Sequence, residues 1–270
     1  MAGSRGPLAV LAGAQKHGQD RPPERDANRA AGTLGADIDA RAGGCFHDGT
    51  LASARPFLQA IGREGSSEAT LTAIQVPLPA AARFVPEYPI RTDRLALRPF
   101  SRADVDAVFS YRGLPEVAQY LFDHPMSRDQ CAEAVRVRAG QFAFAREGDK
   151  ILLGVERRED SRLIGEVSLI WRSVTDRQAE LGYILHPEAQ GHGYATEAAR
   201  ALLDFGFGAA DLHRIYARCD DRNARSARVM ERLGMTQEAH LRDHTFHKGR
   251  WSGEFVWAIL APEWTAMRRI

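Results

Sequence analysis

Cysteine is scarce in this sequence: Cys45, Cys131 and Cys219 are the three in 270 residues. An odd number of widely spaced cysteines provides neither a disulfide framework nor the paired spacing of a zinc cluster. Such cysteine use is typical of a reducing compartment, so we expect a cytoplasmic protein.

Long hydrophobic runs and an excess of one charge are lacking as well. No apolar run approaches the roughly 18 residues that cross a bilayer, and "PLAVLAGA" at residues 7–14 is too rich in small residues for a secretion signal. The 36 basic and 35 acidic side chains give a formal net charge of +1. A cationic excess that would bind nucleic acid or anionic lipid is therefore missing. We expect neither nucleic acid nor membrane as a partner.

The composition changes near residue 88. Residues 1–88 are rich in Ala, Gly, Arg and Pro and show no sustained helical or strand period. Periodic patterns begin after them, and the chain, 44% hydrophobic, has enough apolar residues for a sizeable core. We therefore expect a low-complexity, disordered extension at residues 1–88 and one folded domain at residues 89–270.

The patterns after residue 89 predict a strand, two helices, three strands, a helix, a strand, a helix and two strands. Ser101 and Ser127 are the expected N-caps of the first two helices, and Gly234 is the expected end of the last. The strands are expected near residues 92–100, 150–158, 163–174, 179–187, 213–219, 238–247 and 253–260. This order indicates an α/β fold with one central sheet.

The stretch "HPEAQGHGYATEA" at residues 186–198 joins a predicted strand to a predicted helix. Gly191 and Gly193 can adopt positive φ and admit a ligand close to the main chain, and a helix N-terminus offers unpaired N–H groups. These features predict a phosphate-binding loop. The dinucleotide motif G-x-G-x-x-G fails at Thr196, and the Lys-Ser/Thr pair of a P-loop is missing, so a nucleotide is not the expected ligand.

Residues 190–195, Gln-Gly-His-Gly-Tyr-Ala, match the pattern Q/R-x-x-G-x-G/A. Together with "AELGYILHP" before them and "TEAARALLDFGF" and "NARSARVMERLGM" after them, they make residues 90–262 resemble the GNAT acyltransferase superfamily, closest to its RimJ/RimL branch. The resemblance implies a central mixed, mostly antiparallel sheet flanked by helices. It also implies an N-acetyltransferase that moves acetyl from acetyl-CoA to a primary amine, by direct attack in a ternary complex.

The resemblance further implies where acetyl-CoA binds. The fourth strand of the sheet would splay from the fifth, and pantetheine would fill the gap like a missing strand. Its partners would be main-chain groups of Ile184, Leu185 and His186, and Asn223 would hydrogen-bond the pantetheine arm. The pyrophosphate would be held by Gln190, Gly191, His192, Gly193, Tyr194 and Ala195.

Two residues are the expected catalytic groups. Glu180 lies on a strand face two residues from Gly182, which leaves space beside it, so we expect Glu180 to act as general base through water. The alternative is a structural carboxylate paired with a basic neighbour. Ser226 heads the apolar stripe of its helix, and the resemblance makes it the proton donor to the leaving thiolate. The alternative is a packing residue that bonds its own backbone.

The late hairpin contains further polar candidates. Some members of the branch place a glutamate at the position of Thr245, so Asp243 and His244 beside it are alternative bases. His240, His244 and His247 could suggest a metal site. On a strand, however, the first two lie roughly 13 Å apart and the third points away. We expect no metal.

The sequence leaves several alternatives open. The acceptor could be a protein N-terminus, an aminoglycoside, a polyamine or another small amine, and the acyl group could be succinyl rather than acetyl. A non-catalytic module that only binds acyl-CoA is the alternative outside enzymes. Acyl-CoA and an amine are the expected ligands, and the chain could be a monomer or a homodimer.

Overall fold

The computed structural model describes residues 9–10 and 84–269 of the chain. Most of the extension predicted at residues 1–88 lies outside these described residues. The prediction that this extension is disordered therefore stays a prediction. Residues 84–88 contact the folded domain. The main chain of Phe84 exchanges two hydrogen bonds of 2.8 and 2.9 Å with Phe144, and Tyr88 donates a hydrogen bond to the carbonyl of Phe142.

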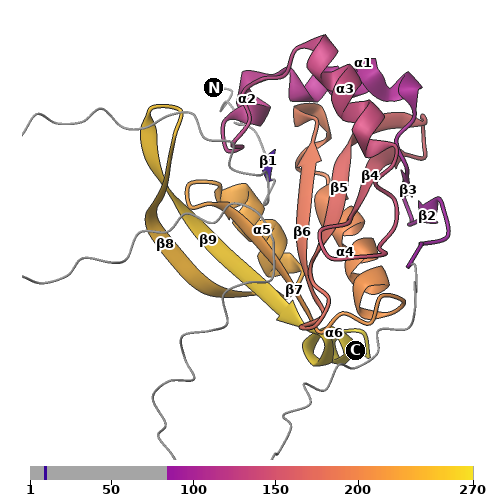
Figure 1. Ribbon diagram of the computed structural model, residues 1–270, viewed down its shortest axis with the longest axis vertical. Helices are drawn as coiled ribbons and strands as arrows, with labels where there is room; N and C mark the ends of the chain where they lie inside the picture. Colours follow the sequence, from indigo (N-terminus) through magenta and orange to yellow (C-terminus); the bar gives the residue numbers. More distant parts are fainter. Residues whose placement is uncertain (1–8, 11–83, 270) are drawn as a thin grey trace, which may run out of the picture. The chain divides into compact units, whose positions relative to one another are not determined.

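One mixed sheet organises the described residues (Figure 1). Its strand order is β2-β3-β4-β5-β6-β7-β9-β8, with β1 paired to β6, and the pair β6–β7 is parallel whereas the other pairs are antiparallel. The strands are β1 (Ala9–Val10), β2 (Ile90–Arg91), β3 (Leu95–Arg98), β4 (Lys150–Arg157), β5 (Arg162–Ser173), β6 (Gln178–Leu185), β7 (Arg214–Asp220), β8 (Thr236–His247) and β9 (Arg250–Leu260). The predicted mostly antiparallel sheet is confirmed.

The α-helices lie where the sequence predicts them, with two additions, and two short 3-10 helices (η) accompany them. Their bounds are η1 (Arg102–Asp104), α1 (Val105–Arg112), α2 (Pro115–Ala118), α3 (Arg128–Arg138), η2 (Pro187–Ala189), α4 (Tyr194–Phe207), α5 (Ala224–Arg232) and α6 (Ala261–Met267). The sequence analysis missed α2 and α6, because four and seven residues are too short to show a helical period. None of the helices in the described residues combines the length and apolarity needed to cross a lipid bilayer.

The predicted helix ends at Ser127 and Gly234 are confirmed, whereas Ser101 precedes the short η1 and the N-cap of α1 is Asp104. The Ser127 side chain accepts from the main-chain N–H of Gln130, and the Gln130 side chain accepts from the N–H of Ser127, so a complete capping box starts α3. Gly234 follows α5 with φ +75°, a conformation that glycine adopts without a steric penalty. α5 therefore ends where the sequence predicts.

Two hydrophobic clusters cover the two faces of the sheet. Leu152 of β4 packs with residues of α1 and α3, whereas its neighbours Ile151 and Leu153 pack with residues of α4. Side chains alternate between faces along a strand, so α1 and α3 cover one face and α4 covers the other. In Figure 1, α1, α2 and α3 gather at one end of β4, β5 and β6.

A buried ionic cluster attaches the first helices to the sheet. Glu166 of β5 accepts a hydrogen bond of 2.9 Å from Tyr111 of α1 and one of 2.6 Å from Arg138 of α3, and Arg112 lies 3.3 Å away. Burial alone would raise the pKa of Glu166, but the two guanidinium groups outweigh it and hold the pKa below its ordinary value. The carboxylate therefore remains ionised in the core.

β6 and β7 form a fork. They pair in parallel only along residues 178–180 and 214–216, although both strands continue for several residues beyond that point. Figure 1 shows the two strands diverging, with α5 next to the opening. The fork opens toward the end of β6 that leads into the glycine-containing loop.

Candidate functional site

The loop after β6 has the backbone geometry that its glycines predict. Gly191 and Gly193 both adopt positive φ, at +84° and +82°. Gly193 is the N-cap of the 14-residue helix α4, and glycine has no side chain to accept the N–H groups of the first turn. The N–H groups and the positive end of the helix dipole therefore remain available to an anion.

A cavity of about 310 Å³ lies against this loop and extends to α5. From α5 it receives Arg225, Arg228 and Arg232, which share one helix face because they are spaced three and four residues apart. The sequence-predicted residues in its lining are Leu185, Gln190, Gly191, Gly193, Tyr194 and Ala195. A loop of free amides opposite three guanidinium groups is suited to a ligand with several phosphates.

We call this cavity the groove. One buried polar atom in its lining residues has no hydrogen-bond partner among the described residues. Thr196 contributes to the groove lining, and its Oγ1 is buried without a hydrogen-bond partner among the described residues. Buried hydroxyl groups are almost always hydrogen-bonded, so this atom requires a ligand or a water. The groove therefore fits a polar ligand chemically as well as in shape.

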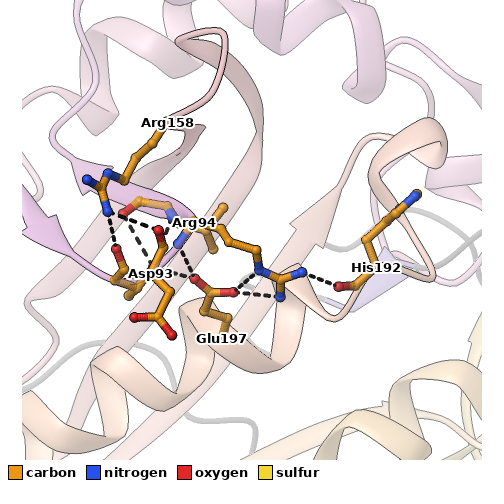
Figure 2. A network of polar contacts seen from close by, with 7 residues as sticks. Asp93, Arg94, Arg158, His192 and Glu197 are labelled. Atoms are coloured by element: carbon orange, nitrogen blue, oxygen red, sulfur yellow. Dashed lines mark hydrogen bonds and ion pairs between the residues drawn. The ribbon is translucent and has the colours of Figure 1, made fainter.

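The loop is held from outside the groove by a polar network (Figure 2). The Arg94 guanidinium donates 2.9 Å to the carbonyl of His192 in the loop, and its Nε donates 2.7 Å to Glu197 of α4. Glu197 also accepts from the Arg94 main-chain N–H at 2.8 Å and from the Thr92 hydroxyl at 2.6 Å. Hydrogen bonds from Thr92 and Arg94 outweigh partial burial and hold the pKa of Glu197 below its ordinary value.

Aromatic contacts complete this attachment. The Arg94 guanidinium lies 4.7 Å from the centre of the Tyr194 ring, and the His192 ring stacks on Tyr194 with ring centres 5.7 Å apart. The hydrogen bond from Arg94 orients the His192 carbonyl toward the Arg94 side chain. The residue pair Arg94 and Glu197, about 100 positions apart in sequence, therefore fixes the conformation of the loop.

Only some main-chain groups of β6 face the open side of the fork. The N–H of His186 donates 2.8 Å to Ile164 of β5. Alternation along the strand then directs the groups of Ile184 toward β5 as well, and those of Tyr183 and Leu185 toward the fork. β1 pairs with this edge in register with Tyr183 and Ile184.

The predicted Gln190 connects the end of β6 to α5. Its side-chain amide donates 3.2 Å to the carbonyl of Leu185, and its amide oxygen accepts 3.2 Å from Arg225. Gln190 thus lies between the strand edge and the arginine face of α5.

Asn223 and Ser226 lie at the start of α5. The Asn223 side chain is the N-cap and accepts 3.1 Å from the Ser226 N–H. Ser226 is fully buried, as its place at the head of the apolar stripe predicts, and its hydroxyl lies 3.0 Å from the Tyr183 hydroxyl. Neither Asn223 nor Ser226 is among the residues that line the groove in this part of the chain.

Glu180 is fully buried where β6 and β7 are still paired. Arg172 of β5 donates to its carboxylate at 2.7 Å, and Arg218 of β7 donates at 3.0 Å. The Tyr216 hydroxyl donates a third, longer bond of 3.3 Å. These contacts correspond to the alternative of a structural carboxylate paired with basic neighbours.

A second, narrow pocket lies between β7, β9 and the segment that follows α2. It has a volume of about 20 Å³, which is space for about one water. Glu254, 8% exposed, lies in its lining, 3.4 Å from Arg218 and 3.6 Å from His244. Tyr120, Phe122, Asp220, Thr245 and His247 are also in the lining.

The three late histidines have separate partners. His240 lies 2.9 Å from Asp221, His244 lies near Glu254, and the His247 ring lies 5.3 Å from the Phe122 ring. Within the described part of the chain, no group of three or more His, Cys, Asp and Glu side chains is placed to hold a metal ion.

Sequence reasoning missed several residues of this site. The spacing of Arg225, Arg228 and Arg232 would have revealed a basic face on the predicted helix. No comparable signal connects Arg94 with Glu197, because a contact across about 100 residues leaves no local pattern.

Comparisons with known proteins agree with this geometry. Residues 94–236 match the family described as Acetyltransferase (GNAT) domain. The chain is 32% identical to the N-acetyltransferase YnaD of Bacillus subtilis over 65% of this chain and 98% of that protein. It is 26% identical to the [ribosomal protein uS5]-alanine N-acetyltransferase of Escherichia coli, over 68% of this chain and 96% of that protein.

A solved structure of spermidine N-acetyltransferase from Vibrio cholerae, in complex with CoA and spermine, superimposes with a TM-score of 0.55. Its sequence is 26% identical, and the match covers 64% of this chain and 99% of that one. The family match covers more than half of the chain, and the sheet, the fork and the glycine loop are those the resemblance implies. The chain belongs to the GNAT family and is an N-acetyltransferase.

Proposed function

We propose that the protein transfers an acetyl group from acetyl-CoA to a primary amine, by direct attack of the amine in a ternary complex. The observation that carries this proposal is the groove, where free amides of the α4 N-terminus lie opposite three arginines of α5. Relatives in the GNAT family with spermidine or a protein alanine in their names support an amine acceptor. The proposal includes a cytoplasmic location.

The groove would hold acetyl-CoA through groups that match its parts. The amides of residues 191–195 and the three guanidinium groups would bind the phosphates. Pantetheine would pair with the open edge of β6 through Leu185 and Tyr183. In this proposal Tyr183 takes the place of Ile184 and His186 beside Leu185, because the main-chain groups of Ile184 and His186 face β5. His192 would contribute its N–H.

Direct attack requires no covalent enzyme intermediate. The amine nitrogen bonds to the thioester carbon, the carbon–sulfur bond breaks, the amine loses a proton to a base, and the CoA thiolate gains one. Of the two cysteines in the described residues, Cys219 lies on β7 of the fork; it is buried, and burial raises the pKa of its thiol to about 12. A thiol of that pKa supplies almost no thiolate at neutral pH, which supports transfer without an acyl-cysteine.

Ser226 is the proposed proton donor, and Glu180 is the proposed base acting through water. Burial raises the pKa of Tyr183, so its hydroxyl remains protonated beside Ser226 and keeps the serine hydroxyl in a fixed hydrogen bond. Asn223 accepts from the Ser226 N–H as the N-cap of α5, and it remains the proposed hydrogen-bond partner of the pantetheine arm. The two arginines on Glu180 favour a second candidate function, a module that binds acyl-CoA without turnover, because they occupy the carboxylate.

Steady-state kinetics of Glu180→Gln and Ser226→Ala separate the two candidates. We expect kcat to fall about 100-fold or more for each, with acetyl-CoA affinity by calorimetry unchanged within about twofold. Wild-type protein that binds CoA but turns over none of spermidine, an alanine-initiated peptide and an aminoglycoside, with acetyl- or succinyl-CoA, would support the binding module instead.

A further inference from the structure

Lys248 occupies a position that its turn does not favour. It forms the two-residue tip of the β8–β9 hairpin with Gly249, and both residues have positive φ, +49° and +73°. A turn of this kind favours Asn, Asp or Gly at both positions, because other side chains are strained there. The turn therefore does not explain the lysine.

The Lys248 ammonium group instead binds the segment that follows α2. It donates to the carbonyl oxygens of Ala118, Leu121 and Asp123 at 2.6, 2.7 and 2.8 Å. An ammonium group has three N–H donors, so these carbonyls use all of them. The chain has 3 lysines and 33 arginines. A planar guanidinium group could not converge on one point in this way.

The segment fixed by Lys248 forms one wall of the narrow pocket. Tyr120 and Phe122 lie between the bound carbonyls, and both residues line the pocket opposite Glu254. The Phe122 ring contacts the ring of His247, whose Nδ1 is buried and has no hydrogen-bond partner among the described residues. Burial lowers the pKa of His247, so the ring is neutral at neutral pH. His247 is a lining residue of the pocket, so its unsatisfied ring nitrogen belongs to the wall that an entering ligand would meet.

We propose that Lys248 is a positioning residue for the amine acceptor. By binding the three carbonyls, Lys248 fixes Tyr120 and Phe122 at the pocket. The pocket has space for about one water, so the wall must move when an amine enters, and Lys248 determines how far it moves. Lys248 itself touches no substrate. This inference rests on the proposed function: Arg218 lines the pocket and donates to Glu180, the proposed base, so we take the pocket as part of the acceptor site.

The test compares Lys248→Met with Lys248→Gly and Lys248→Asn. All three remove the ammonium group, but Gly and Asn suit the turn better than lysine does. We expect KM for the accepted amine, spermidine or an alanine-initiated peptide, to rise about tenfold in all three variants, because the acceptor must then order the wall. KM for acetyl-CoA should stay within about twofold, and amide hydrogen exchange of residues 118–123 should become faster.

Two results would overturn the proposal. If Lys248→Gly and Lys248→Asn keep the wild-type acceptor KM, the lysine does not position the acceptor, even if exchange becomes faster. Unchanged exchange in all three variants would show that the three hydrogen bonds do not hold the segment. A wild-type protein inactive on these two amines and on an aminoglycoside would instead contradict the proposed function, on which this inference rests. The exchange measurement would still show separately whether the attachment exists.

Discussion

Single side chains fix the conformation of the glycine loop at a distance from the groove. Gly191 and Gly193 provide the positive φ angles, but the carbonyl of His192 is held by Arg94, and Arg94 is held by Glu197. The loop amides can face an anion only while this conformation persists. Binding of acyl-CoA is therefore expected to depend on residues that do not touch it.

Replacing Arg94 with Met tests this dependence. We expect KM for acetyl-CoA to rise about tenfold with kcat nearly unchanged, because the loop must then be ordered by the ligand itself. Arg158→Met is the matched control. Arg158 donates to the carbonyls of Thr92 and Asp93 in the same network but does not contact the loop (Figure 2). Equal effects of both substitutions would contradict a specific role for Arg94.

Cys219 offers a second test at this scale. Its thiol pKa of about 12 leaves roughly one thiolate in ten thousand at pH 8. We expect Cys219→Ala to keep kcat within about threefold, and mass spectrometry of protein mixed with acetyl-CoA to detect no acetylated Cys219. An acetyl group on this residue at a rate matching kcat would overturn direct attack.

The sequence predicts single residues best where the determinant is local. The Ser127 cap, the positive φ of Gly191 and Gly193, and the burial of Ser226 all depend on neighbours within one turn, and each is confirmed. The partners of Glu180 were not predictable, because they come from neighbouring strands whose register the sequence does not state.

At the scale of elements, the attachment of α1 and α3 to the sheet depends on one buried carboxylate. Glu166 binds groups from both helices, and the segment that forms the wall of the narrow pocket lies between these helices in the chain. The order of helices and strands along the chain and the late hairpin were predictable from alternation and turn residues. The short helix α2 and the contact of Lys248 with the following segment were not, because both depend on packing.

Glu166→Gln should lower the free energy of unfolding at pH 7 by about 3–5 kcal/mol, because two buried guanidinium groups lose their counter-charge. The pKa of Glu166 is lowered on folding, so its contribution is full above the unfolded value of 4.5 and is lost as pH falls through the lower folded value. Urea denaturation against pH measures this. Exposed Glu159→Gln is the control, and equal losses in both variants would contradict the cluster's role.

At the scale of the whole molecule, residues 84–270 are the proposed catalytic unit. The boundary proposed from composition at residue 88 is moved to residue 83, because Phe84 and Tyr88 bond to the domain. YnaD matches over 98% of its own length, which supports a unit of this size. β1 pairs with the edge of β6 that pantetheine would use, so β1 and acetyl-CoA would compete for this edge.

Removing residues 1–83 should therefore leave kcat unchanged and lower KM for acetyl-CoA by roughly threefold, since the ligand no longer competes with β1. Kinetics of the full chain and of residues 84–270 with the same acceptor provide the comparison. A higher KM in the shorter chain would contradict competition by β1, and a loss of kcat would contradict the proposed catalytic unit.

In the proposed reaction, acetyl-CoA binds in the groove and an amine attacks it there. The most direct measurement is release of CoA thiol from acetyl-CoA by the purified full chain, with and without spermidine or an alanine-initiated peptide, beside calorimetry of CoA binding. The account predicts CoA binding and thiol release that depends on one of these amines. Absence of CoA binding would contradict the groove as its site, and CoA binding without amine-dependent thiol release would contradict attack by the amine.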